Sequence, residues 1–395
     1  MYNFDKKIDR CNTDCIKWDT FEASNISKDT LPMFIADMDF EVLPEISQAL
    51  DKRVRQVVYG YTTTTDHYYQ AIQDWFKNRH HWDIQKDWII SMNGVVPAIN
   101  AGVQALTHID DSIMIFSPVY MPFKAAIESN QRRCVESHLV LENGRYTIDY
   151  ADMENKIVSE NVKALIFCNP HNPVGRVWTK DELTRLVDIC VKHHVWIISD
   201  EIHHDFVFKP NVYTPVANIN EQAAMMTITC TAPGKTFNLA GLQTANTIIS
   251  NIEVKEKFMK ILDSWGCSHG SNMMGVAACE AAYTHGALWV DELVDYVQGN
   301  MTYVESYIQK NIPHVQMIHP EGLYLAWIDL RALNMTDEAL RNFLIEKAKV
   351  WPNAGEWFGA DGSGFARINL ACPRSQVEKF VKQLEQAVKA LYVGV

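Results

Sequence analysis

The sequence has no excess of positive charge and no long uncharged apolar run. Its 36 lysine and arginine residues stand against 48 aspartate and glutamate residues, which leaves a formal net charge of −12. Nucleic acid and anionic membrane are therefore not expected partners, because both repel an acidic protein. No uncharged segment approaches the roughly 20 residues of a membrane span, and the N-terminal MYNFDKKIDR lacks the apolar stretch of a signal peptide. We expect a cytoplasmic protein that acts on small molecules.

The sequence also lacks paired cysteines at the spacing of a metal site. Nine cysteines are present, and Cys11 and Cys15 form a C-x3-C pair without a second pair to match it. Most of the others lie in apolar runs, such as ALIFC, which ends at Cys168. This pattern favours buried, reduced thiols over disulfides or zinc, so no metal is expected.

No internal repeat or low-complexity linker divides the 395 residues, and the apolar share of 47% can form a substantial core. Between 46 and 288, helical patterns alternate with short apolar runs, which is typical of an α/β domain with a mostly parallel sheet. A helix is expected over 181–194, with Thr179 and Glu182 as a capping box. The expected strands are Trp88–Met92, Ile113–Phe116, Lys163–Cys168, Val195–Ser199 and Met225–Thr229.

Beyond residue 288 the pattern indicates a second, smaller α+β domain, 289–395. Helices are expected over 289–310, 336–348 and 375–392, with strands over 322–330 and 365–370. Residues 1–45 are less regular, and we expect them to pack with this smaller domain, which leaves 46–288 as the large domain.

Lys235 lies in TAPGKTFNLAG, directly after the apolar run MMTITC. A lysine held half-buried at the end of a strand has a lowered pKa and a nucleophilic amine. On position alone, a solvated loop lysine is the more common explanation.

Asp200 follows the strand-like VWIIS and opens a crowded stretch of acids and histidines, SDEIHHD. A carboxylate there can stay ionised opposite a protonated ring nitrogen, with His203 supporting it. A helix N-cap or a metal ligand is the alternative interpretation. Metal is disfavoured, because ligands so close in sequence cannot all face one point.

Two further loops follow expected strands. Asn172 lies in NPHNPVGR, where two Asn-Pro steps impose an extended, turning backbone that can aim an amide. Gly94, Val95 and Val96 follow WIISMN and precede a helical pattern, an arrangement that can cradle a phosphate at a helix N-terminus. Each could also be an ordinary turn.

Tyr120 and Arg367 complete the candidates. Tyr120, in SPVYMPF, can stack on a flat ring, although buried loop tyrosines are common. Arg367 alternates with Phe365 and Ile368 in GFARINL. An arginine among apolar residues needs a planar anion, either a substrate carboxylate held by two hydrogen bonds or a structural ion-pair partner.

Together these residues meet the needs of pyridoxal 5′-phosphate (PLP). That cofactor requires a lysine for its aldehyde, an acid at its pyridine nitrogen, donors for its phosphate and a flat contact for its ring. The order Tyr120, Asn172, Asp200, Lys235, Arg367 resembles that of fold-type I PLP enzymes, the aspartate-aminotransferase-like family, over essentially the whole chain. The resemblance implies a large PLP-binding domain with a mostly parallel, seven-stranded type of sheet. It also implies that Asn172 contacts the phenolic oxygen of the cofactor.

Finer motifs resemble the MalY/PatB group of cystathionine and cysteine-S-conjugate β-lyases. They are ADMDF (36–40), YGYT (59–62), NGVVPAI (93–99), NPHNPVGR (169–176), SDEIHHD (199–205), KTFNLAGLQ (235–243) and GFARINLACPR (364–374). Aminotransferases of this fold tend to place an arginine eight residues after the lysine, whereas this chain has Gln243, as the lyase group does.

One residue departs from the group. Gly234 stands where a serine usually precedes the lysine. A hydroxyl donor to the phosphate is then missing, and Thr231 and backbone amides are left to compensate.

The resemblance also implies a homodimer with the active site at the interface. Tyr61 of YGYT is expected to reach the phosphate or the substrate from the neighbouring subunit, although Tyr59 and Tyr61 could equally be packing residues.

The activity implied is β-elimination of L-cystathionine, or of another cysteine S-conjugate, to homocysteine or another thiol, pyruvate and ammonia, a reaction of methionine biosynthesis. Lys235 would remove the Cα proton, Arg367 would hold the α-carboxylate, and Tyr120 would help to deprotonate the incoming amine. Transamination by the same residues is the alternative. A lyase with an additional regulatory, protein-binding role is a third possibility.

Overall fold

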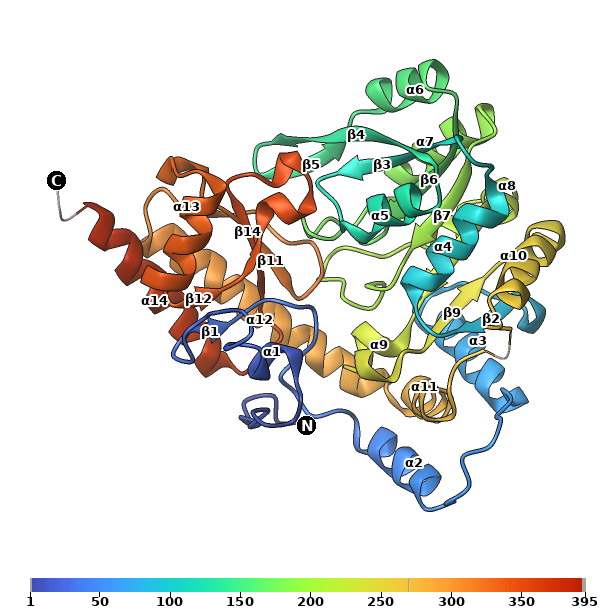
Figure 1. Cartoon of the computed structure of the whole chain (residues 1–395), viewed down its shortest axis with the longest axis horizontal. Coiled ribbons are helices and arrows are strands. Elements are labelled where there is room, and N and C mark those ends of the chain that lie inside the picture. The colour runs from blue at the N-terminus through green and yellow to red at the C-terminus, as the bar shows by residue number, and fades with distance from the viewer. Residues whose placement is uncertain (1, 269, 393–395) are drawn as a thin grey trace.

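The computed structural model describes residues 2–268 and 270–392, and its largest element is a sheet of eight strands (Figure 1). Six strands run in one direction, and β9 and β5 run against their neighbours. In spatial order the strands are β2 (Ile89–Met92), β9 (Ala245–Ile248), β8 (Thr227–Thr231), β7 (Trp196–Asp200), β6 (Val162–Cys168), β3 (Ser112–Ser117), β4 (Arg133–Glu142) and β5 (Arg145–Ile148). The expected α/β fold with a mostly parallel sheet is confirmed, although the sheet has eight strands where a seven-stranded type was expected.

Four of the five expected strands lie within one residue of the observed ones, and the fifth is misplaced. Met225 and Met226 end helix α8 (Glu221–Met226), and the strand begins only at Thr227. The helix is fixed by Asn220, whose side chain accepts a hydrogen bond from the amide of Ala223. The hairpin β4–β5 and strand β9 were not expected from the sequence.

Helices cover both faces of this sheet. On one face α4 (Val95–Leu106), α5 (Pro122–Ser129) and α10 (Ile252–Ser264) form an apolar core with strands β3, β6, β7 and β8. On the other face α6 (Tyr150–Ser159) and α7 (Lys180–Lys192) enclose a second core. The expected capping box of α7 is present, because Thr179 and Glu182 hydrogen-bond to each other's backbone amides.

A small C-terminal sheet lies beside the large one (Figure 1). Its antiparallel strands are, in order, β10 (Gln316–Met317), β11 (Leu325–Asp329), β14 (Phe365–Asn369) and β13 (Asn353–Ala354). The helices of this region are α12 (Ala287–Asn311), α13 (Asp337–Asn342), which a π-helical turn Phe343–Lys347 continues, and α14 (Arg374–Tyr392).

The N-terminal segment pairs with the C-terminal region at β1 (Leu31–Pro32), which is parallel to β12 (Val350–Trp351). The remaining helices are α1 (Ile16–Asp19), α2 (Pro44–Val54), α3 (Asp66–His80), α9 (Pro233–Thr236) and α11 (Met273–His285). The domain boundaries at 45 and 288 stay a prediction. No helix in the described part of the chain is long and apolar enough to cross a bilayer.

Candidate active site

A pocket of about 390 Å³ opens at the carboxyl ends of the parallel strands. The turns after β3, β6, β7 and β8 supply its floor, which is where ligands bind in open α/β sheets. The N-terminal segment and the small sheet supply the remaining wall. The lining residues are Phe34, Ile35, Ala36, Val95, Val96, Tyr120, Cys168, Asn172, Asp200, Ile202, His203, Lys235, Asn353 and Arg367.

Lys235 lies in the short helix α9, four residues after the end of strand β8. Its Nζ donates a hydrogen bond to the carbonyl oxygen of Ala36 at 2.5 Å. Burial, with the nearby positive charge of Arg367, lowers the pKa of Lys235 to about 8. No carboxylate of the described residues forms an ion pair with it. The amine is therefore closer to its neutral, nucleophilic form than an exposed lysine.

Asp200 ends β7 and is buried, with one carboxylate oxygen accepting from the amide of Ile202 at 3.1 Å. Burial raises the pKa of Asp200 to about 7. Among the described residues it has no ion-pair partner, so the carboxylate lacks the cation that would stabilise its charge in the pocket.

His203 is also buried in the pocket wall. Its Nδ1 has no hydrogen-bond partner among the described residues, and its ring lies against Tyr324 with centroids 5.8 Å apart. Burial and the charges of Lys235 and Arg367 hold the pKa of His203 well below its ordinary value. A neutral imidazole with a free nitrogen is thus available to a ligand.

Arg367 reaches the pocket from β14 of the small sheet. Its guanidinium donates to Asn172 Oδ1 at 3.0 Å and to Asn353 Oδ1 at 2.6 Å, whereas Nε has no described partner. The structural ion pair considered from the sequence is absent within the described chain, and burial lowers the pKa of Arg367 to about 10. A buried arginine without an anion is suited to bind one.

Tyr120, Val95 and Val96 line the pocket as well. Burial and Asp200 raise the pKa of Tyr120, which keeps its hydroxyl protonated. Helix α4 begins at Val95 without a side-chain cap, so its first amides are open to an anion. Gly94, at φ +154°, takes a backbone conformation that strongly favours glycine and directs the chain into that helix.

Three candidates do not line the pocket. Gly94 lies behind its two valines, and Thr231 is fully buried, with its hydroxyl donating to the carbonyl of Asn246 at 3.0 Å. Tyr61 is fully exposed on the segment between α2 and α3. Their proposed contacts with the cofactor or the substrate stay predictions.

Two contributors to the pocket escaped the sequence reasoning. Asn353 begins the two-residue strand β13 and accepts from both Arg367 and the amide of Ile35. Phe34, Ile35 and Ala36 also line the pocket, and Ala36 is the first residue of ADMDF. The motif indicates the family, but its sequence alone does not predict that it lies beside the pocket.

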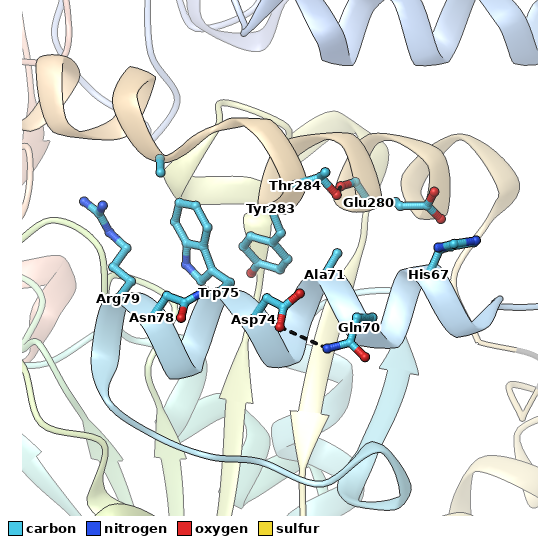
Figure 2. A pocket seen from close by; sticks show the side chains of 11 residues that line it. His67, Gln70, Ala71, Asp74, Trp75, Asn78, Arg79, Glu280, Tyr283 and Thr284 are labelled. Atoms are coloured by element: carbon cyan, nitrogen blue, oxygen red, sulfur yellow. Dashed lines mark hydrogen bonds between the residues drawn. The ribbon is translucent and has the colours of Figure 1, made fainter.

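A second, wider groove lies between α3 and α11 (Figure 2). Trp75 and Tyr283 face each other across it, with ring centroids 5.1 Å apart, and Gln70 donates to Asp74. None of the candidate residues lines this groove. The chemistry is therefore assigned to the pocket at the strand ends.

The residues of that pocket fit PLP. A nucleophilic amine, a buried carboxylate, an uncapped helix terminus and an unpaired histidine nitrogen converge on it, and each matches one functional group of the cofactor. Nδ1 of His203 and Nε of Arg367, which have no partner among the described residues, belong to side chains that line this pocket and are available to a ligand.

Comparison with known proteins agrees with this geometry. Residues 29–384 match the model of the family "Aminotransferase class I and II". The cystathionine beta-lyase PatB of Bacillus subtilis is 37% identical, over 98% of this chain and 100% of its own length.

Two solved structures are also similar. A PLP-bound putative aminotransferase from Clostridium difficile has a TM-score of 0.95 and 43% identity, over 98% of this chain and 100% of that one. Cystalysin from Treponema denticola, which contains PLP, has a TM-score of 0.95 and 40% identity, over 99% and 100%. The protein belongs to the class I and II aminotransferase family and, within it, is similar to the cystathionine β-lyase and C–S lyase group.

Proposed function

We propose that the protein is a PLP-dependent C–S β-lyase that cleaves L-cystathionine or a related cysteine S-conjugate to a thiol, pyruvate and ammonia. One observation carries the proposal: buried Asp200, half-buried Lys235 and buried Arg367 meet in one pocket without ion-pair partners among the described residues. Perturbed, uncompensated groups in a cleft are typical of catalytic sites.

PLP, when bound, withdraws electrons from the Cα atom of an amino acid joined to it. Lys235 would hold its aldehyde, and Asp200 would face its ring nitrogen. A positive charge on that nitrogen would lower the pKa of Asp200 from about 7 and keep the carboxylate ionised. His203 and Asn172 would bind the ring's polar substituents, and the first amides of α4 would bind the phosphate.

Arg367 would bind the substrate's α-carboxylate through two parallel hydrogen bonds. Asn172 and Asn353 already hold two guanidinium nitrogens and so fix the plane of the group before substrate arrives. Pre-ordering of this kind reduces the entropy lost on binding.

Lys235 would then accept the Cα proton at Nζ. With a pKa of about 8, about a tenth of the amine is neutral at pH 7, far more than for an exposed lysine, and this form can act as a base. The same nitrogen can return a proton to the departing sulfur. Water then converts the released enamine into pyruvate and ammonia, which balances the elimination. The expected role of Tyr120 in deprotonating the substrate amine would require a phenolate, and its raised pKa disfavours that form, so we assign Tyr120 only the contact with the flat cofactor ring.

The aminotransferase reaction is the second candidate, because the similar Clostridium difficile structure is described as a putative aminotransferase. It uses the same residues and differs in where the proton is returned. An aminotransferase consumes a 2-oxo acid and releases no thiol.

We further propose a homodimer. The end of α2 and the segment that follows it expose an apolar group on one stretch of chain: Val54, Val57, Val58, Tyr59 and Tyr61. Such a group is usually covered by a partner. In Figure 1 this stretch projects at the edge of the molecule. A cytoplasmic location, a place in methionine biosynthesis, contact of Tyr61 with the neighbouring site and a regulatory partner stay predictions.

Product analysis tests the proposed reaction. L-cystathionine, L-cysteine and S-alkyl cysteines are each incubated with the holoenzyme, with and without a 2-oxo acid, and thiol and pyruvate are measured. Equal amounts of both products without any 2-oxo acid are expected. Turnover that requires the 2-oxo acid and releases no thiol would establish the aminotransferase instead. Lys235→Ala serves as the inactive control.

A further inference from the structure

The residue after Lys235 is anchored on the side of α9 that faces away from the pocket. Thr236 is fully buried, and its Oγ1 donates to Oδ2 of Asp205 at 2.7 Å. Helix α9 has only four residues and no side-chain cap. So short a helix is not stable by itself, and tertiary contacts must fix its orientation.

Asp205 is a buried carboxylate surrounded by donors. Besides Thr236 it accepts from Nε of Arg79 at 3.0 Å and from Nε2 of His80 at 2.9 Å, and Nε2 of His204 lies 3.0 Å away. Burial alone would raise the pKa of Asp205, but the His204 and His80 contacts hold it well below its ordinary value. The group is therefore a permanent anion with its acceptor positions filled.

His80, His204 and Asp205 place their ligand atoms within 4.8 Å of one another, as a metal site requires. The hydrogen bonds from Arg79 and Thr236 occupy the carboxylate instead, and a positive guanidinium beside it opposes a cation. The cluster is accordingly a hydrogen-bonding hub, by which we mean Asp205 together with Arg79, His80, His204 and Thr236 around it.

The hub lies in the turn that carries the cofactor-facing groups. Asp200 and His203 precede Asp205 by five and two residues, and Nδ1 of His204 is 2.6 Å from the carbonyl oxygen of Glu201. One carboxylate thus joins the turn bearing Asp200 to the helix bearing Lys235. Arg79 extends the link to α12 through an ion pair with Asp291 at 2.8 Å.

The other side of Lys235 has its own anchor. The side chain of Asn238 accepts from the amide of Met38 at 2.9 Å and donates to the carbonyls of Met38 and Phe40. These bonds connect α9 to the N-terminal segment, which also holds Lys235 through Ala36. Asn238 thus ties this part of the chain to the N-terminal segment, and the bond from Thr236 to Asp205 ties it to the large sheet.

We propose that Thr236 and Asp205 are a positioning pair, which sets the location of the Lys235 amine relative to Asp200. Neither side chain lines the pocket, so the pair acts through α9 and the turn after β7. The inference rests on the proposed role of Lys235. A small displacement of a reacting group lowers catalytic rates strongly, so loss of this single bond is expected to affect turnover more than substrate binding.

The test replaces Thr236 by valine, which keeps the shape and removes the hydroxyl, and by serine, which keeps the hydroxyl. Thr229→Val is the matched control, because Thr229 is equally buried and its Oγ1 has no hydrogen-bond partner among the described residues. Three quantities are measured: the rate at which the apoenzyme captures PLP, the pH midpoint of the bound cofactor's absorbance change, and kcat and KM separately.

Thr236→Val is expected to slow PLP capture and lower kcat about tenfold or more and to move the absorbance midpoint by about half a pH unit or more. KM should change little. Thr236→Ser should restore all three quantities, and Thr229→Val should match the parent protein. A Thr236→Val protein that melts earlier but keeps the parent midpoint, capture rate and kcat would show that the bond is merely structural.

Failure of the underlying assignment is distinguished by mapping the lysine that carries PLP after borohydride reduction. PLP on a lysine other than Lys235 contradicts the proposed function itself. PLP on Lys235, together with an unaffected Thr236→Val protein, contradicts only the positioning pair.

Discussion

Two sets of buried charges, one in the pocket and one in the surrounding scaffold, behave in opposite ways. Asp200 and Asp205 are five residues apart and both buried, yet burial raises the pKa of Asp200 to about 7 while histidine contacts depress that of Asp205. Asp205 has donors on every side, whereas Asp200 receives one backbone hydrogen bond.

The same contrast holds for the cations. Buried Lys17 forms an ion pair with Asp39 at 2.8 Å, and buried Arg176 pairs with Glu321 at 2.7 Å and Glu182 at 2.8 Å. Lys235 and Arg367 have no such partner in the described chain, and burial lowers the pKa of each, to about 8 and about 10. Charged side chains of the scaffold are paired with opposite charges, whereas those of the pocket have no such partner among the described residues. This difference is expected where a charged cofactor and substrate supply the opposite charges.

The largest expected effect is loss of the pocket lysine. Lys235→Ala should reduce kcat by about a thousandfold or more, because both the cofactor attachment and the proton acceptor disappear. Its melting temperature should not fall, since a buried amine without an ion-pair partner is removed. Steady-state kinetics and thermal melts measure both quantities.

Lys17→Met is the scaffold control for that variant. It leaves Asp39 short of a cation and should lower the free energy of unfolding by about 3 kcal/mol, with kcat per folded molecule retained. If Lys235→Ala kept a tenth of the parent activity, the contrast between pocket and scaffold would not hold.

Arginine offers the same comparison with a smaller effect. Arg367→Met should lower kcat/KM by about a hundredfold, mostly through KM, because charge-assisted hydrogen bonds to the substrate carboxylate are lost. Stability should be unchanged or higher. Arg176→Met should do the reverse, losing about 3 kcal/mol of stability and keeping KM. Equal effects of the two variants on KM would contradict the claim that Arg367 binds the substrate and Arg176 only stabilises the fold.

The two aspartates should give opposite pH dependence in the cofactor-free protein. Asp200 binds its proton up to about pH 7 when folded but only to about pH 4 when unfolded, so its contribution to stability falls as pH rises between these values. Asp205, with a depressed pKa, contributes stability that is present above about pH 4 and is lost on acidification below it.

Urea unfolding across about pH 2 to 8 measures this difference. Asp200→Asn should remove the decline toward neutral pH, and Asp205→Asn should weaken the protein at every pH above about 4 and progressively less below it. An Asp200→Asn protein with an unchanged pH profile would contradict the assignment of the raised pKa.

The smallest expected effect concerns Gly234. A Cβ atom there would lie 3.6 Å from the nearest atom, Cα of Ala240, so a serine fits without displacement. Gly234→Ser should lower the PLP dissociation constant by up to about tenfold, the value of one additional hydrogen bond. Absorbance titration of the apoprotein with PLP measures it. Weaker binding would mean that the hydroxyl has no phosphate within reach.

The sequence predicted the pocket residues at the ends of the parallel strands better than those supplied by the rest of the chain. Asn172, Asp200 and Lys235 each follow an apolar run that forms a parallel strand, and parallel strands bring their carboxyl ends to one edge. Local rules sufficed for α7 as well, since its capping box depends on residues three apart.

What the sequence missed depends on distant contacts. Asn353 matters because it accepts from Arg367, 14 residues away on the paired strand, and from Ile35, 318 residues away. Thr236 and Asp205 are 31 residues apart. Strand β4 is mostly half-buried or exposed and has no clear apolar alternation, so its pattern is weak.

Borohydride reduction of the PLP-loaded enzyme, followed by peptide mapping, tests the central claim most directly, because it identifies the residue that holds the cofactor. The label is expected on the peptide that contains Lys235, the half-buried pocket lysine whose pKa is lowered and which lacks an ion pair among the described residues. Label on a lysine with an ion-pair partner, such as Lys17 or Lys124, would contradict the account.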